Sequence, residues 1–187
     1  MHTGGRDVDP VNCHLKSKLL TFPGGRFHPR DEDERMRFAS YALFRRAAEA
    51  ATVRAYANEL LGGQGHERAI IVLGDLNDVP EAATTQILLG PSGSEIDTPG
   101  FERPDQGDVF RLWNLAPLIP EKRRFSRRFR GRGELIGHIL VSHALVHSVE
   151  HVDTRAQEPP SITEDPTERR DEPASDHLPV IARLGLE

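Results

Sequence analysis

Three short polar clusters stand where apolar segments of the sequence meet loops, and each carries side chains that can do chemistry. They are His14 in VNCHLKS, Asp75 and Asn77 in GDLND, and Asp176 and His177 in SDHLPV. Alternation along an extended segment places Asp75 and Asn77 on the same face. Two oxygen-bearing side chains can then be aimed at one point, which suits a hard cation such as Mg²⁺, and the cation in turn binds phosphate oxygens.

Each cluster also has an ordinary structural explanation. An aspartate at the end of a strand usually accepts hydrogen bonds from its own turn, and a single Asp-His pair is a weaker signal still. A functional site becomes the better explanation because all three clusters adjoin predicted strands. Sheets often build sites at the edge where their strands end.

The first elements that would position these clusters are a short strand at VNCHLKS and a long helix after a loop rich in glycine and proline. Asp31 stands three residues before Glu34, which predicts a helix cap with its reciprocal partner. Gly62 and Gly63 are expected to end the helix. Its predicted apolar face consists of Met36, Leu43, Ala47, Ala50, Ala57 and Leu61.

The rest of the chain alternates apolar runs with loops. AIIVL has the continuous β-branched composition of a strand covered on both faces. Beyond it we predict a short helix over residues 81–89, a strand at VFRLWNL, adjacent antiparallel strands at RRFSRRFRG and ELIGHILVSHALV joined near Gly131 and Gly133, and a last strand after SDHLPV. The acidic, proline-rich stretch AQEPPSITEDPTERRDEP is predicted to be a mobile loop. This order predicts an α/β protein, a layered α/β sandwich with a mixed sheet.

Composition indicates one soluble globular domain over residues 1–187, since 37% of the residues are hydrophobic and 28% are charged. No apolar run approaches the roughly 20 residues that span a bilayer, and the N-terminus lacks the features of a secretory signal. A cytoplasmic protein is therefore expected. The single cysteine, Cys13, excludes an internal disulfide and is assigned to packing.

Charge is unevenly spread along the chain. The net charge of −5 argues against a protein that coats nucleic acid, but the stretch EKRRFSRRFRGR is strongly basic. It would attract a phosphate-bearing ligand, and a solvated loop that balances nearby acids is an equally good explanation. Its basic residues are Lys122, Arg123, Arg124, Arg127, Arg128, Arg130 and Arg132.

Other residues that invite a functional interpretation receive a structural one. His143, His147 and His151 share a face on either a strand or a helix, but no acidic or cysteine partner stands at ligand spacing. We assign them to a surface or half-buried strand face. Trp113 is assigned to the core, with stacking on a base as the alternative.

The motifs IIVLGDLND, ELIGHILVS and SDHLPV, in this order, resemble the C-terminal half of the endonuclease/exonuclease/phosphatase superfamily of metal-dependent phosphodiesterases. VNCHLKS resembles the strand that precedes them. The resemblance covers most of the chain from Val11 onward and is specific to the superfamily rather than to a substrate. It implies a four-layer α/β sandwich and hydrolysis of a phosphoester with Mg²⁺ or Mn²⁺.

The resemblance also implies roles for the site residues by motif position. Asp75 would orient or deprotonate the attacking water, and Asn77 would hold the phosphate or transition state. Asp176 would contribute to the metal site, which Asp75 and Asn77 would share. His177 would contact the scissile phosphate, and His14 resembles a second active-site histidine that acts as a general acid. In-line displacement at phosphorus needs an activated water, a counter-charge and help for the leaving oxygen.

Two departures from the superfamily pattern bear on activity. Gly137 stands where the strand ELIGHILVS usually carries an aspartate that orients a catalytic histidine, and Glu134 or His138 would have to compensate. Losing such a carboxylate in a related arrangement costs on the order of 10⁴ in rate. The second departure is that the half of the fold before VNCHLKS is not found, so we expect a truncated copy with weak activity alone and a partner that covers the exposed sheet edge.

Three functions remain open from the sequence. The first is a metal-dependent phosphodiesterase or nuclease whose basic stretch holds a polyanionic backbone. The second is an inactive remnant that binds nucleic acid or phospholipid. The third is a phosphomonoesterase or phospholipid hydrolase that uses the same site.

Overall fold

The computed structural model describes every residue except 4, 155–158, 164, 166–174 and 187. Its central sheet has five strands in the order β1-β2-β3-β7-β4. Their bounds are β1 His2–Thr3, β2 Arg6–His14, β3 Ala69–Asp75, β7 Gly137–Val141 and β4 Trp113–Asn114. β2 and β3 run parallel, whereas the other neighbours are antiparallel. The sheet is therefore mixed, as predicted.

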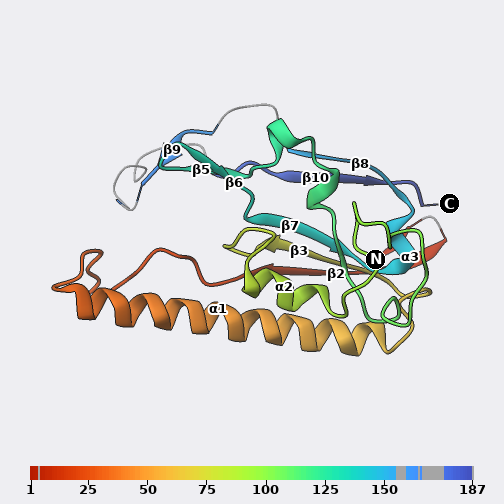
Figure 1. Cartoon of the computed structure of the whole chain (residues 1–187), viewed down its shortest axis with the longest axis horizontal. Coiled ribbons are helices and arrows are strands. Elements are labelled where there is room, and N and C mark those ends of the chain that lie inside the picture. The colour runs from red at the N-terminus through yellow and green to blue at the C-terminus, as the bar shows by residue number, and fades with distance from the viewer. Residues whose placement is uncertain (4, 155–158, 164, 166–174, 187) are drawn as a thin grey trace.

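Helices cover one face of this sheet and further strands cover the other (Figure 1). The helices are α1 (Glu32–Leu61) and α2 (Ala83–Leu89), and the opposite layer is the antiparallel pair β8 (Val149–Thr154) and β10 (Val180–Leu184). A third sheet, at the end of the molecule where α1 begins, contains β6 (Arg132–Glu134), β5 (Arg127–Phe129) and β9 (Ser161–Ile162). Three single-turn helices complete the described elements: η1 (Ala116–Leu118), η2 (Glu121–Arg123) and α3 (His143–Val146). These layers confirm the predicted α/β sandwich.

Strand β3 separates two apolar clusters, as its β-branched composition predicts. Ile70 and Val72 pack on the helix side, in a cluster that includes Leu61 of α1. Ala69 packs on the opposite side, in a cluster that includes Val152 of β8. β3 is therefore covered on both faces, which fixes the position of its polar end.

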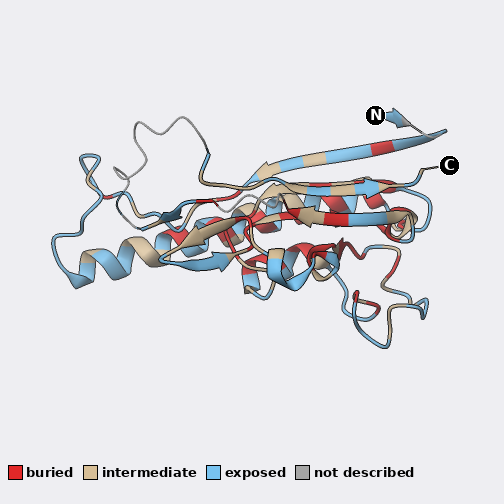
Figure 2. Ribbon diagram, turned by 90° about the horizontal axis from the view of Figure 1, so that it is seen from above, coloured by how far each residue is buried: buried red, intermediate tan, exposed pale blue. Residues whose placement is uncertain are grey.

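Strand β2 lies along one side of the molecule and is mostly exposed (Figure 2). β1 pairs with it only at Arg6 and Asp7. From Asp9 to His14 no strand in the described part of the chain pairs with this edge. An open strand edge is a template for pairing with another chain. The predictions of a covering partner and of a missing N-terminal half stay predictions.

The predicted boundaries of α1 are confirmed, with one correction. The Asp31 carboxylate accepts a hydrogen bond from the Glu34 amide at 2.7 Å, and Gly62 ends the helix in the left-handed region with φ 53°. Glu34 does not return a bond to Asp31 as the reciprocal partner. Its carboxylate instead accepts from the Arg30 amide and from the Arg26 guanidinium.

The predicted apolar face of α1 is right in its second half and wrong in its first. Met36 and Leu43 are 52% and 47% exposed. The first turns of α1, which include Met36, extend past the central sheet (Figure 1). Leu43 lies one position off the buried phase of the helix, because its neighbour Ala42 is buried instead. The buried positions include Arg46 and Arg54, whose stems pack inward while their guanidinium groups find carbonyl and carboxylate partners.

Strand pairing differs from the prediction in three places. The run VFRLWNL forms only the two-residue strand β4. β5 forms its hairpin with β6 alone, and β7 pairs with β3 and β4. The stretch around His151, assigned only to a strand face without bounds, forms β8. Which strand pairs with which depends on contacts distant in sequence, so local patterns do not decide it.

The predicted mobile loop at 156–173 lies largely outside the described residues. Its described portion includes β9, which pairs in parallel with β5. No helix among the residues that the structure describes is both long and apolar enough to cross a membrane.

Candidate active site

Parallel pairing of β2 and β3 brings two of the predicted polar clusters together. The register places His14 directly opposite Asp75 at the ends of the two strands. The third cluster, Asp176 and His177, comes to the same place from the segment before β10. The cleft at this edge has a volume of about 690 Å³. Its walls include His14, Lys18, Leu19, Asp75, Asn77, Arg127, Phe129, Glu134, Asp176 and His177.

The Asp75 carboxylate stands between two imidazole rings. Its Oδ2 lies 3.4 Å from Nδ1 of His177 and 3.7 Å from Nε2 of His14. Its Oδ1 accepts a hydrogen bond from the backbone N–H of Asn77 at 2.8 Å, which fixes the carboxylate. On the far side of the His177 ring, Nε2 lies 3.9 Å from Oδ2 of Asp176. Four of the five predicted site residues, all except Asn77, therefore lie around the Asp75 carboxylate and the His177 ring.

Asn77 borders the cleft in a different way from the others. β3 ends at Asp75, and Asn77 has a left-handed backbone with φ 54°, so the alternation of an extended strand does not apply to it. The side chain is buried, and its amide nitrogen donates to the Leu15 carbonyl at 2.8 Å. Asn77 thus ties the loop after β2 to the loop after β3. Its predicted contact with the phosphate stays a prediction.

Sequence reasoning missed a buried charge network directly behind this site. The Asp78 carboxylate contacts Lys18 Nζ at 2.8 Å, Arg46 Nε at 3.1 Å and the Thr84 hydroxyl at 2.8 Å. Burial alone would raise the pKa of Asp78, but hydrogen bonds from Lys18 and Thr84 and the charges of Lys18 and Arg46 bring this pKa below its ordinary value. Arg46 also donates to the Lys16 carbonyl. The sequence signal for this network was Arg46, a charged residue at the spacing of the buried residues of α1.

Cys13 lies next to the site on β2 and is inert. Its thiol donates to the Leu73 carbonyl at 3.6 Å. Burial, with a smaller contribution from the charge of Asp75, raises the pKa of Cys13 to about 11. A thiol in this state is a poor nucleophile, which agrees with its assignment to packing.

The family of the chain follows from comparison with known proteins. A model described as the Endonuclease/Exonuclease/phosphatase family matches residues 10–177. The chain belongs to this family. The superfamily predicted from the motifs is therefore confirmed.

Comparison with individual proteins adds little. No curated protein matches the chain. A 3'-5' exonuclease from Neisseria meningitidis is similar in structure, with 16% sequence identity and a TM-score of 0.45. The match covers 94% of this chain and 60% of the exonuclease, so the chain spans less than two thirds of that protein's length.

Gly137, which stands where the resemblance implies an aspartate, borders a small cavity beside the site. It pairs with Asp75 across β3 and β7, and a cavity of about 220 Å³ lies beside it, bordered by His138 and His177. Glu134, one suggested substitute, is bound instead to Arg127 at 2.7 Å. The carboxylate nearest to His177 in the described contacts is that of Asp75 itself.

His138, the other suggested substitute, points into the interior. Nε2 lies 2.9 Å from the Asp78 carbonyl and Nδ1 lies 3.1 Å from the Asn114 amide nitrogen. Because a carbonyl only accepts, Nε2 carries the proton and Nδ1 accepts from Asn114. Burial lowers the pKa of His138 despite its bond to the Asp78 carbonyl. The ring is neutral and fully engaged, so it does not take the place of the missing carboxylate.

The cleft offers part of the ligand set of a divalent cation. Among the described residues, no group of three or more histidine, cysteine, aspartate or glutamate side chains is arranged to hold a metal. Of the carboxylates that border the cleft, those of Asp75 and Asp176 both lie within 4 Å of the His177 ring, and Asn77 also borders the cleft. Mg²⁺ is commonly held by one or two carboxylates, with waters and phosphate oxygens completing its shell. The donor types therefore suit a site of that open kind, and the His177 ring lies between the two carboxylates.

The basic stretch is only partly directed at the cleft. Arg127 borders the cleft and is bound to Glu134. Arg123 pairs with Asp153 at 2.7 Å, and Arg124 donates to the Ile119 carbonyl. The pairs of Arg123 and Arg127 agree with the interpretation that this stretch balances nearby acids, and attraction of a phosphate stays a prediction.

The three clustered histidines do not share one face. His143 and His147 belong to the single turn around α3, with ring centroids 5.5 Å apart. His151 is exposed on β8 and lies 3.6 Å from Asp153. Trp113 is buried, as predicted, and its indole nitrogen donates to the Ser94 carbonyl.

Proposed function

We propose that this protein hydrolyses phosphodiesters, as a nuclease or a related phosphodiesterase, with the help of Mg²⁺ or Mn²⁺. The observation that carries the proposal is the position of the Asp75 carboxylate, between His14 and His177 at the edge of an open cleft. A carboxylate between two imidazoles provides both proton acceptors and proton donors within reach of one reacting group.

The residues of the cleft suit the needs of in-line displacement at phosphorus. Asp75 is held in place by the backbone N–H of Asn77 and would orient an attacking water. His177, whose ring lies between the carboxylates of Asp75 and Asp176, would contact the scissile phosphate and stabilise its developing charge. His14 is three-quarters exposed at the rim, where it can give a proton to a leaving oxygen.

A divalent cation, when bound, would neutralise charge on the phosphate and make a bound water more acidic. We infer that Asp75 and Asp176 would hold it, with the carboxamide of Asn77 nearby. The substrate's own phosphate oxygens would complete its ligands.

The test is hydrolysis of bis-p-nitrophenyl phosphate by the purified protein in the presence of Mg²⁺ or Mn²⁺. Asp75→Asn keeps the shape of the side chain and removes its charge, so kcat/KM should fall by about 10³ to 10⁴. Asp9→Asn, the same change on an exposed part of the neighbouring strand β2, is the matched control and should leave the rate unchanged. Equal rates for wild type and Asp75→Asn would remove the basis of the proposal.

One observation favours the second candidate, a protein that binds nucleic acid or phospholipid without hydrolysis. Gly137 provides no carboxylate beside His177. In that case wild-type protein shows no metal-dependent hydrolysis, and Asp75→Asn binds an oligonucleotide as tightly as wild type. A phosphomonoesterase or phospholipid hydrolase would instead prefer p-nitrophenyl phosphate or phosphatidylcholine vesicles.

A further inference from the structure

A second groove adjoins the cleft and is not used by the proposed chemistry. It has a volume of about 490 Å³ and lies between the first half of α1, the loop before it and strand β5. Lys18, Leu19 and Phe129 border both the groove and the cleft, so the two hollows adjoin along these three residues. Figure 1 shows β5 and the start of α1 at the same end of the molecule.

The walls of this groove are apolar and partly uncovered. Leu19, Phe27 and Leu43 are each about 40% to 47% exposed, which is unusual for large apolar side chains that face one hollow. Leu43 is exposed because it lies one position off the buried phase of α1, which runs through Ala42 and Arg46. Contiguous exposed apolar surface of this kind marks binding sites in soluble proteins.

A pair of cations stands at the junction between groove and cleft. Lys18 and Arg46 both contact the single carboxylate of Asp78, at 2.8 Å and 3.1 Å. Two cations thus share one anion. Lys18 is 40% exposed and can therefore also meet a ligand. A phosphate placed at the junction would be attracted to this pair.

An aromatic ring flanked by arginines stands at the same junction. The guanidinium groups of Arg127 and Arg130 lie 5.4 Å and 5.8 Å from the centre of the Phe129 ring. Aromatic rings beside cations are the usual platform for an unstacked nucleobase in single-stranded nucleic acid. The size of the groove lies within the range of about 300–1,000 Å³ typical of small-ligand sites.

We propose that this groove binds the nucleotide next to the scissile phosphate of a single-stranded nucleic acid. The neighbouring phosphate would meet Lys18, and its base would lie against Phe129 and the apolar wall that includes Leu43. An acyl chain fits less well, because Arg35 and His28 also border the groove and would face its methylene groups. The proposal rests on the proposed function for its substrate, and it is tested by binding alone.

The experiment measures fluorescence polarisation of a labelled ten-nucleotide oligodeoxythymidylate in EDTA at 0.15 M salt, so hydrolysis does not enter. Leu43→Glu places a negative charge on the groove wall and should weaken binding about tenfold or more. Phe44→Glu is the matched control: the next residue of the same helix, 70% exposed and outside the groove, should change the Kd less than twofold. Phe27→Ala, a second change on the wall, should weaken binding severalfold.

The outcomes separate this proposal from the proposed function. Weaker binding by Leu43→Glu and Phe27→Ala, with equal thermal unfolding and an unchanged Phe44→Glu, supports the groove even if wild type hydrolyses nothing. Equal affinities for wild type and Leu43→Glu would overturn it even if wild type is an active phosphodiesterase. Loss of binding to phosphatidylcholine/phosphatidylglycerol vesicles in Leu43→Glu, without loss of oligonucleotide binding, would overturn it in favour of a lipid surface.

Discussion

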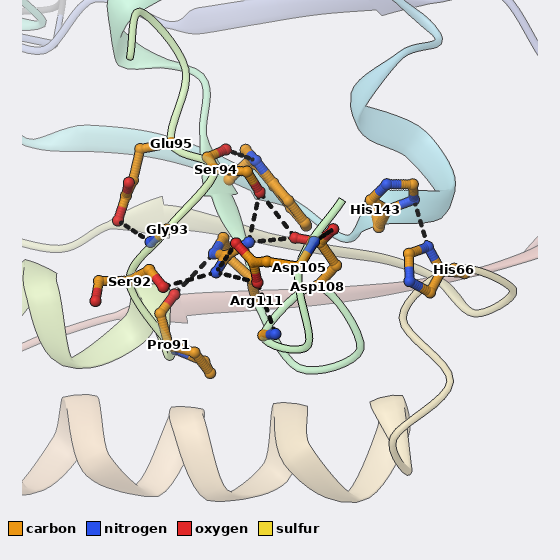
Figure 3. Close-up of polar contacts among 12 residues, drawn as sticks. His66, Pro91, Ser92, Gly93, Ser94, Glu95, Asp105, Asp108, Arg111 and His143 are labelled. Atoms are coloured by element: carbon orange, nitrogen blue, oxygen red, sulfur yellow. Dashed lines mark hydrogen bonds and ion pairs between the residues drawn. The ribbon is translucent and has the colours of Figure 1, made fainter. Parts of the chain in front are cut away.

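Two charged clusters in this molecule differ in how fully their charged groups are bonded. One surrounds Arg111 in the loops around β4 (Figure 3), and the other surrounds Asp75 at the end of β3. Arg111 is 1% exposed, and its guanidinium group is bound to the carboxylates of Asp105 and Asp108. Asp75 is partly open to the cleft, and its two histidine neighbours stand at 3.4 Å and 3.7 Å, beyond good hydrogen-bonding distance.

Arg111 has no bonding capacity left for a ligand. Besides the two carboxylates, it donates to the Pro91 carbonyl at 2.7 Å and the Ser92 carbonyl at 2.8 Å, and to the Ser94 hydroxyl. These contacts hold the long loop after α2 against β4. A buried charge that is fully bonded serves architecture, whereas charges that are close but loosely bonded remain able to take up a substrate.

The largest effect that tests this contrast is expected for Arg111→Met. It leaves the Asp108 carboxylate buried without its cation, so the free energy of unfolding should fall by about 3–5 kcal/mol. Urea denaturation measures the change, and hydrolysis per folded molecule should stay the same. Arg45→Met removes an exposed ion pair with Glu49 on α1 and should have no measurable effect. Similar curves for wild type and Arg111→Met would mean that the cluster is not structural.

The sequence predicts the open site better than the closed cluster. His14, Asp75 and His177 stand at the ends of strands that their own composition defines, and parallel pairing of β2 and β3 then brings the first two together. The Asp31 cap is equally local, because donor and acceptor are three residues apart. Patterns that span only a few residues can be recognised within a single segment of the sequence.

What could not be predicted depends on distant parts of the chain. Met36 and Leu43 follow the predicted apolar period of α1, but the buried phase of the helix runs through Ala42, Arg46 and Ala50, with an arginine at a core position. Arg46 lies in the buried stretch because Asp78, 32 residues away, neutralises it. Arg111 likewise collects partners from a loop whose path has no periodic pattern. Burial of a charge is decided by its partner, and the partner is known only from the fold.

The next largest effect is expected for Gly137→Asp, which would add a bonding partner to the loosely bonded cluster around Asp75. A Cβ built at Gly137 meets Val180 at 3.4 Å and Ser126 at 3.6 Å, so a side chain fits beside the 220 Å³ cavity. Its carboxylate could then orient His177. The rate of bis-p-nitrophenyl phosphate hydrolysis should rise by about tenfold or more, a part of what an orienting carboxylate is worth.

Gly137→Asn is the matched control for this change, because it has the same size without the charge and should not raise the rate. A folded Gly137→Asp protein no faster than wild type would show that Asp75 already orients His177 as well as a dedicated carboxylate would.

The smallest effect concerns His138, which borders the cavity beside His177 yet is bonded like Arg111. Burial places its pKa in the folded state below the ordinary value of 6.5. Below about pH 6.5 the unfolded chain therefore takes up a proton that the folded protein does not, so stability is lost as pH falls, by up to about 1.4 kcal/mol per pH unit. Urea denaturation from pH 7.5 to 5.5 measures this loss.

His138→Gln decides whether this ring belongs to the architecture or to the chemistry. Glutamine can donate to the Asp78 carbonyl and accept from Asn114 without titrating, so the pH dependence of unfolding should become shallower. His151→Gln, at an exposed histidine, should leave it as in wild type. If His138→Gln instead shifts the pH profile of hydrolysis and not that of unfolding, then the position of His138 near His177 affects the chemistry, even though its ring is fully hydrogen-bonded. Full bonding would then fail to separate structural charges from catalytic ones.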